Sequence, residues 1–307
     1  MPAFNQGRTA TTLAVLIYAL AWGGSVAYMA ASGGDGWLSP VEVFGIFAVL
    51  CGGVAWALTR GAEAPEIEVK RPALESGAFL IYLALYAVLF LGFGMSAARA
   101  ALPAGREQEV LVLALKLGAH VVLPCLLLLM LGARLSPLIQ AGLKGRKFWR
   151  TLLVMGGLFL AINAVISPSL QHIADLHAAP QTLAMMTPLA YAWISIEAGL
   201  NEEFLFRAVL QTRLSAWFKS PIAAICVTAL LFGLAHAPGL YLRGGLEDAG
   251  SSNNWLMVVA YTIGVLSPIG LLFGMIYART KSMLLVVLLH AMVDILPGLP
   301  EFVRIWG

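Results

Sequence analysis

The chain has 307 residues, of which 60% are hydrophobic and only 11% are charged, and its formal net charge is +3. Because a water-soluble domain carries about 25% charged residues, this composition excludes a soluble globule and predicts a polytopic membrane protein. The basic residues are scattered between apolar runs, which favours loops near lipid headgroups over a nucleic-acid surface, so no DNA or RNA partner is predicted.

Apolar runs follow one another along the whole chain. A helix needs about 20 residues to cross a hydrocarbon core of roughly 30 Å. The runs of this length are 10–31, 38–59, 75–98, 108–132, 149–167 and 255–278, and three shorter or interrupted runs are 183–217, 221–236 and 282–296. None alternates apolar and polar residues as barrel strands do. The predicted fold is therefore an all-α transmembrane helix bundle of about 8–9 spans, with the first run retained as a span.

The distribution of Lys and Arg predicts the orientation of these spans. With the N-terminus in the cytoplasm, the inside segments hold 14 basic residues and the outside segments hold 4. Cytoplasmic loops carry the excess of basic residues. We therefore predict a multi-pass protein of the cell (inner) membrane, with its N-terminus in the cytoplasm and its C-terminus outside.

The basic stretch 134–150 is the best internal boundary, since polar motifs gather after it. It predicts a four-span scaffold over 1–133 and a catalytic module over 134–307. The stretch itself suits either a helix lying in the membrane interface or an ordinary basic loop. Further on, Pro238 is expected to end a helix, and 238–254, rich in Gly, Ser and Asn, is expected to be a mobile connection or a lid.

The most informative stretch, Asn201 to Arg207, places three formal charges among apolar residues. Charge at membrane depth is costly unless it is paired or hydrated, and it indicates a functional site. Glu203 and Arg207 are four apart, so they can form an ion pair on one helix face. Glu202 then points elsewhere without a local counter-ion, which suits a general base. The alternative is that both glutamates lie at a hydrated helix end.

Two further polar pairs follow at helical spacing, Phe232 with His236 and His290 with Asp294. Packing against Phe232 would hold the His236 ring, and a carboxylate bonded to one ring nitrogen would set the tautomer of His290. Each pair taken alone is also compatible with a structural histidine whose hydrogen bonds are satisfied.

Together, Glu-Glu-x-x-x-Arg, Phe-x-x-x-His and His-x-x-x-Asp resemble the motifs of the CPBP family. This family comprises intramembrane CAAX-processing and bacteriocin-processing proteases, including type II CAAX prenyl endopeptidases and bacterial Abi proteins. The resemblance covers roughly 180–297 and none of the first four spans. It implies an endopeptidase that acts on a membrane-associated peptide or protein, which is lipidated in one branch of the family. The resemblance also implies a glutamate-activated water and no cofactor or metal.

The resemblance also implies roles for individual residues. Glu202 would be the general base, and His236 would help to hold the water. His290, assisted by Asp294, would stabilise the oxyanion, while Glu203, Arg207 and Phe232 would support the site. The prenyl endopeptidase branch usually has Asn where this chain has Asp294. Because an ionised carboxylate cannot donate a hydrogen bond, orienting His290 is the role that the resemblance supports for Asp294.

Three alternatives accompany this interpretation. Two histidines and a glutamate are also a zinc-ligand set, although the usual His-Glu-x-x-His helix is absent. A non-catalytic or immunity-type relative would use the same cavity to bind or scaffold a partner. A secondary transporter would show symmetry between two halves, which the uneven distribution of polar residues does not suggest.

Other polar residues inside predicted spans have weaker interpretations. Lys116 and His120 are one turn apart and suggest half of a proton path, or a lysine that snorkels or pairs with a carboxylate. Glu197, five residues before Glu202, either lines the same cavity or lies at a hydrated break near Gly199.

Overall fold

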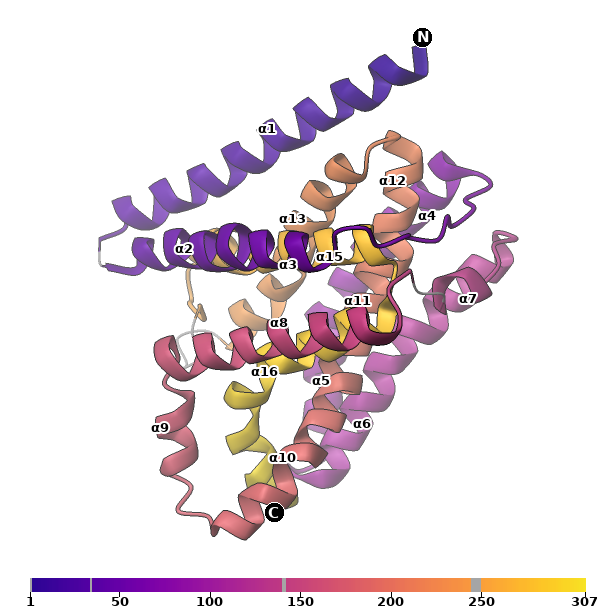
Figure 1. The fold of residues 1–307 in the computed structure, drawn as a ribbon. Helices are drawn as coiled ribbons and strands as arrows, with labels where there is room; N and C mark the ends of the chain where they lie inside the picture. Colours follow the sequence, from indigo (N-terminus) through magenta and orange to yellow (C-terminus); the bar gives the residue numbers. More distant parts are fainter. Residues whose placement is uncertain (1, 34, 140–141, 244–249) are drawn as a thin grey trace.

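The computed structural model describes residues 2–33, 35–139, 142–243 and 250–307, and the chain there is helices and connecting loops without strands (Figure 1). The α-helices are α1 Pro2–Ala31, α2 Leu38–Val43, α3 Gly52–Leu58, α4 Pro72–Leu85, α5 Met95–Ala101, α6 Arg106–Leu117, α7 Leu123–Met130, α8 Gly145–Ile166, α9 Ser169–Ala174, α10 Pro180–Ile194, α11 Asn201–Glu203, α12 Thr212–Phe218, α13 Pro221–Arg243, α14 Trp255–Tyr261, α15 Ser267–Thr280 and α16 Met283–Trp306.

Short turns of other helical types interrupt several spans. The π-helical turns are η2 Phe44–Cys51, η3 Tyr86–Gly94, η4 Gly118–Val122, η6 Ser195–Leu200, η7 Phe204–Gln211 and η8 Thr262–Leu266, and the 3₁₀ turns are η1 Asp35–Trp37 and η5 Ser136–Ile139. π-Helical turns occur frequently at functional sites. Two of them, η6 and η7, flank the short helix α11 that carries Glu202.

Nine helical runs in the described part of the chain are long and apolar enough to cross a membrane. They are Gln6–Ala31, Leu38–Leu58, Pro72–Ala101, Arg106–Met130, Gly145–Ile166, Pro180–Phe218, Pro221–Leu242, Trp255–Thr280 and Met283–Trp306. We number these runs as spans one to nine. They confirm the predicted all-α transmembrane bundle, and the interrupted run 183–217 is a single helical span.

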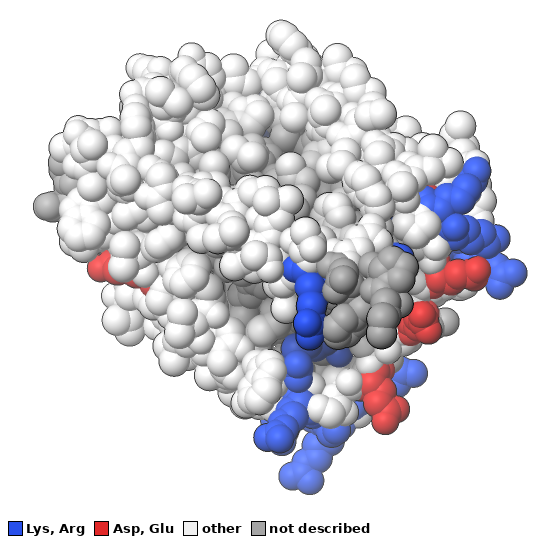
Figure 2. All heavy atoms as spheres, turned by 90° about the horizontal axis from the view of Figure 1, so that it is seen from above, with Lys and Arg blue, Asp and Glu red and all other residues white. Residues whose placement is uncertain are grey.

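The last two spans form the centre of the bundle, and the ninth carries His290 and Asp294. In the eighth and ninth spans 56% and 50% of the most apolar window is buried, against 17% in the third. α16 packs between α8 and α10, while α1 lies on the outside against α13 and α14 (Figure 1). Large apolar side chains such as Leu20 and Val165 are 75% and 84% exposed. Figure 2 shows an extensive uncharged surface with most of the visible charges gathered at the right and lower edges, as expected of a lipid-facing bundle.

One local prediction is wrong, and for another stretch the structure favours one of the two alternatives. Pro238 does not end its helix, because α13 continues to Arg243; proline is tolerated inside membrane spans because the surroundings satisfy the backbone groups it frees. The described residues of 134–150 form a 3₁₀ turn, a loop and the start of α8, so the interfacial helix is absent from them. Gly142 in this loop lies close to another segment, since a Cβ there would lie 2.1 Å from the Glu63 carbonyl oxygen. Residues 140–141 of this stretch, and 244–249 of the expected mobile connection or lid, lie outside the described residues.

Contacts between the span ends agree with successive spans that cross the membrane in alternating directions. Arg279 Nε donates to Thr59 Oγ1 at 2.8 Å, which joins two ends that the Lys and Arg count assigns to the same side. At the opposite end of the bundle, Arg106 Nε donates to the Ile305 carbonyl at 2.9 Å. The C-terminus therefore lies beside a segment predicted to be outside.

Candidate active site

The first motif supplies a fully buried ion pair. Arg207 Nε donates to Glu203 Oε2 at 3.0 Å, and both side chains have 0% exposure. The guanidinium carbon lies 5.0 Å from the centre of the Phe232 ring, where cation–π attraction adds to the pairing. The predicted i, i+4 pair is thus present, and Phe232 contacts its cation as well as the neighbouring histidine.

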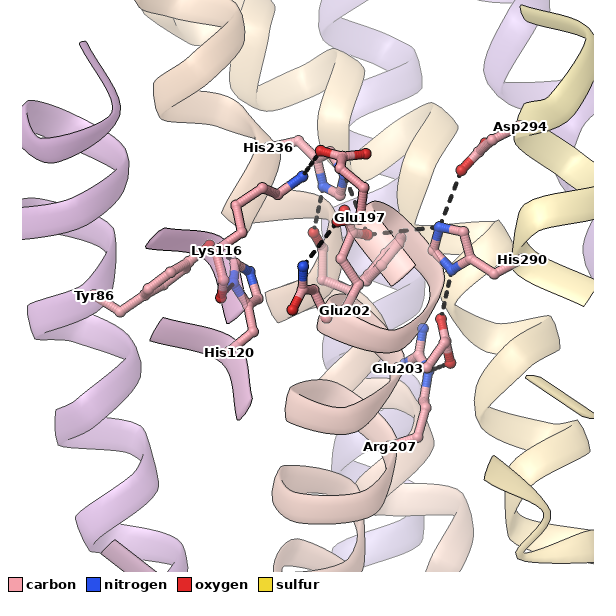
Figure 3. Close-up of polar contacts among 12 residues, drawn as sticks. Tyr86, Lys116, His120, Glu197, Glu202, Glu203, Arg207, His236, His290 and Asp294 are labelled. Carbon is pink, nitrogen blue, oxygen red and sulfur yellow. Dashed lines mark hydrogen bonds and ion pairs between the residues drawn. The ribbon is translucent and has the colours of Figure 1, made fainter. Parts of the chain in front are cut away.

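His290 joins the last span to this pair. Its Nδ1 is 2.9 Å from Glu203 Oε1, and its Nε2 is 3.2 Å from Asp294 Oδ2 (Figure 3). The ring also stacks on Phe273, with 5.3 Å between the ring centres. Both ring nitrogens face carboxylates, an arrangement that suits a proton on each nitrogen. Asp294 does contact His290, but Glu203 of another span makes the shorter contact, which the sequence did not predict.

His236 is held by its own helix. Its Nδ1 is 2.9 Å from the Phe232 carbonyl oxygen, which can only accept, so Nδ1 carries a proton. The Phe232 ring meets the imidazole edge to face, with 5.0 Å between the centres. In the neutral ring Nε2 is then an acceptor. This nitrogen points at Glu202, and the two atoms Nε2 and Oε2 are 3.8 Å apart.

Glu202 lies between the two histidines. Its Oε2 is 3.8 Å from Nε2 of His236 and 3.8 Å from Nε2 of His290. This oxygen is buried and has no hydrogen-bond partner among the described residues. A buried acceptor without a partner is unfavourable in a structural role. The separations exceed a direct hydrogen bond, yet one small polar molecule can bridge them.

Three of the seven motif residues open onto a cavity of about 640 Å³. Glu202, His236 and Asp294 line it from the sixth, seventh and ninth spans. The opposite wall belongs to the third and fourth spans and includes Tyr86, Lys116 and His120, and Glu197 also lines the cavity (Figure 3). Lys116 pairs with Glu197, so the interpretation of Lys116 as a lysine paired with a carboxylate fits. Tyr86 was not identified from the sequence, because a tyrosine in an apolar run carries no charge pattern.

Metal ligation has its own geometric requirement. Among the described residues no group of three or more His, Cys, Asp or Glu side chains is arranged to hold a metal ion.

Residues 184–296 match the family model of the Rce1-like type II CAAX prenyl endopeptidases. The match supports the assignment of this segment to the CAAX protease family. The matched segment contains all seven motif residues, from Glu202 to Asp294, whereas Tyr86, Lys116 and His120 precede it. A search of curated proteins and a search of solved structures found no match.

The match and the helical runs bear on two expectations from the sequence. The family model supports a CAAX-type intramembrane endopeptidase, whose substrate is a peptide or protein. The apolar helical runs of the described residues support a multi-pass membrane protein. The roles of the individual motif residues stay predictions.

Proposed function

We propose that the protein hydrolyses a peptide bond of a membrane-associated substrate with a water molecule activated by Glu202. The observation that carries this proposal is the buried, unpartnered Oε2 of Glu202, 3.8 Å from Nε2 of both His236 and His290. A general base needs such an oxygen within reach of a single water.

The tautomer of His236 adds a physical reason. Its Nδ1–H is donated to the Phe232 carbonyl, so Nε2 faces Glu202 as an acceptor. A water between them can donate one hydrogen to Glu202 and the other to His236. Its lone pairs are then directed away from both side chains, toward a substrate carbonyl in the cavity.

In the proposed reaction Glu202 removes a proton from this water while the water oxygen attacks the carbonyl carbon. His290, protonated at Nε2, turns this donor from Asp294 to the developing oxyanion, a contribution of a few kcal/mol for comparable donors. Glu202 then delivers its proton to the leaving amine. Glu203, Arg207 and Asp294 act as positioning residues, because they hold His290 and do not touch the reacting atoms.

The test compares wild type with Glu202→Gln, expressed in the same cells and purified into lipid nanodiscs. Membrane proteins that accumulate uncleaved in the variant give the substrate, which is then assayed as a tethered peptide with and without a lipid. We expect Glu202→Gln to lower the rate about 10²- to 10⁴-fold and chelators to have no effect. Glu42→Gln is the matched control, since Glu42 is exposed and outside the cavity.

Two outcomes would overturn the mechanism. Full activity of Glu202→Gln would remove the proposed base. Loss of activity with a chelator and recovery with zinc would favour the metal-dependent alternative.

We also propose that the N-terminus is cytoplasmic. The excess of basic residues on alternate segments supports this orientation, and the contact of Arg279 with Thr59 joins two of those segments. Labelling of single cysteines placed next to Arg8 and next to Arg304 in intact cells tests it, and labelling of the former from outside would reverse the orientation.

A further inference from the structure

A second charged pair lies in the cavity apart from the motif residues. Lys116 of the fourth span reaches across to Glu197 of the sixth span, and the two form an ion pair (Figure 3). Their side chains are 16% and 26% exposed, and both line the cavity with Glu202. Charges inside membrane spans are costly and mark ion or substrate paths when they face an aqueous cavity.

The π-helical turn η6 explains why Glu197 shares a face with Glu202. In an α-helix, residues five apart point about 140° away from each other. In a π-helical turn the hydrogen bonds join residues five apart, which brings such residues closer to alignment. Since η6 spans Ser195–Leu200, Glu197 lies along the same cavity wall as the proposed base, and Lys116 meets it from the opposite wall.

A buried histidine and tyrosine hold the backbone of Lys116 in place. His120 Nδ1 donates to the Lys116 carbonyl at 2.9 Å, and the Tyr86 hydroxyl is 2.8 Å from His120 Nε2. Both ring nitrogens of His120 are therefore occupied, and its ring is only 3% exposed. His120 supports the fourth span and leaves Lys116 as the group that faces the cavity.

Lys116 has unused hydrogen-bonding capacity. An ammonium group has three N–H donors, and among the described residues its hydrogen-bond acceptor is Glu197. We propose that Lys116 binds a carboxylate group of the substrate, releasing Glu197 when the substrate enters. A carboxylate is the group required, because an uncharged carbonyl competes poorly with Glu197 for an ammonium ion. This inference rests on the proposed function and names a specificity residue for it.

The carboxylate has two possible sources, the end of the substrate chain or an acidic side chain. Three fluorescein-labelled apolar tetrapeptides separate them: one with a free C-terminal carboxylate, one with a C-terminal amide, and one amide with a single aspartate side chain. Their binding to the full chain in nanodiscs is measured by fluorescence anisotropy, which needs no hydrolysis. Glu202→Gln removes the proposed base and keeps Lys116. Binding of the probes to this variant therefore measures carboxylate recognition separately from cleavage.

We expect wild type to bind one of the two carboxylate probes about tenfold or more tightly than the plain amide, the range of a hydrogen bond to a charged group. Lys116→Met abolishes this preference, whereas Glu197→Gln preserves or strengthens it because the ammonium is freed. The double variant Lys116→Met/Glu197→Gln has no unpaired charge to destabilise it and also lacks the preference. Lys144→Met is the control, since Lys144 is exposed and outside the cavity.

A purely structural ion pair gives a different pattern. Both single variants then unfold at lower temperature, the double variant recovers, and wild type does not distinguish the carboxylate probes from the amide. That result, or a preference that survives in Lys116→Met, would overturn the proposal.

Discussion

The bundle contains two buried charged regions that differ in their access to the cavity. Arg213 of α12 pairs with Glu75 of α4 at 3.5 Å, both side chains are 1% exposed, and Arg213 also donates to the Ala208 carbonyl at 3.0 Å. Neither residue lines the cavity, whereas Glu202 and His236 do. Burial and charge are common to both regions, so access to the cavity is what distinguishes a site for chemistry from an ion pair that joins spans.

The same contrast divides the two adjacent glutamates. Glu203 has 0% exposure and contacts both Arg207 and His290, whereas Glu202 is 16% exposed and its Oε2 makes no hydrogen bond to a described residue. We therefore expect Glu203 to matter for stability and Glu202 for catalysis.

The largest effect is expected for Glu203→Gln. The change leaves Arg207 buried without its counter-ion, and breaking such a pair costs about 3–5 kcal/mol. His290 loses its Nδ1 partner at the same time, so activity falls with stability. Thermal unfolding in detergent measures the loss, with Glu202→Gln as the matched variant that keeps the wild-type unfolding temperature. Equal stability of both variants would contradict the division of roles.

Arg213→Met tests the buried ion pair of Arg213 with Glu75, which does not line the cavity. It leaves Glu75 buried and unpaired, so stability falls by about 3–5 kcal/mol, while kcat of the folded fraction stays at the wild-type value. Arg213→Met/Glu75→Leu removes both charges and should recover most of the stability. A fall in kcat that persists in the double variant would show that this region also serves catalysis.

Gly199→Ala should have an intermediate effect. A Cβ at this position would lie 2.7 Å from the Val287 carbonyl oxygen, so α16 must move away from the helix that carries Glu203. Overpacking of this kind costs about 1–3 kcal/mol, and the shift lengthens the Glu203–His290 contact and lowers kcat. Gly157→Ala is the control, because nothing lies within 4 Å of its Cβ. Unfolding temperature and kcat of the two variants decide the matter.

The smallest effect concerns Lys281, in the turn between the last two spans. Burial, and then the positive charge of Arg213, lowers the pKa of Lys281 to about 8. In the unfolded chain the pKa of Lys281 has its ordinary value of about 10.4. Between about pH 8 and this value the unfolded state therefore binds more protons than the folded state, so Lys281 makes the free energy of unfolding rise as pH increases from about 8 toward 10. The stability difference between wild type and Lys281→Met should grow in favour of wild type over that range. A constant difference would contradict the shift.

Much of the fold could be predicted because each span carries its own signal. Apolar length predicts the spans, and helical spacing predicts pairs within one span, such as Glu203 with Arg207 and His290 with Asp294, which the structure contains. The division into a scaffold over 1–133 and a catalytic module over 134–307 stays a prediction. The third and fourth spans nevertheless line the cavity through Tyr86 and Lys116.

Contacts between spans were not predictable from these patterns. Whether His290 meets Glu203, and whether Lys116 meets Glu197, depends on how each helix is rotated about its axis and how far it is shifted along its neighbour. The π-helical turns η6 and η7 change that rotation locally, and the spacing of residues in the sequence does not predict these turns.

By itself, therefore, the sequence determined the membrane class, about eight to nine spans, the residues of the three motifs and the pairs four residues apart. The tertiary structure decided which glutamate holds His290, which one is left without a partner, and that Lys116 shares the cavity. The physical reason is that hydrophobic length and the helical period are local properties, whereas pairing across helices depends on packing between distant parts of the chain, such as Glu203 and His290, which are 87 positions apart.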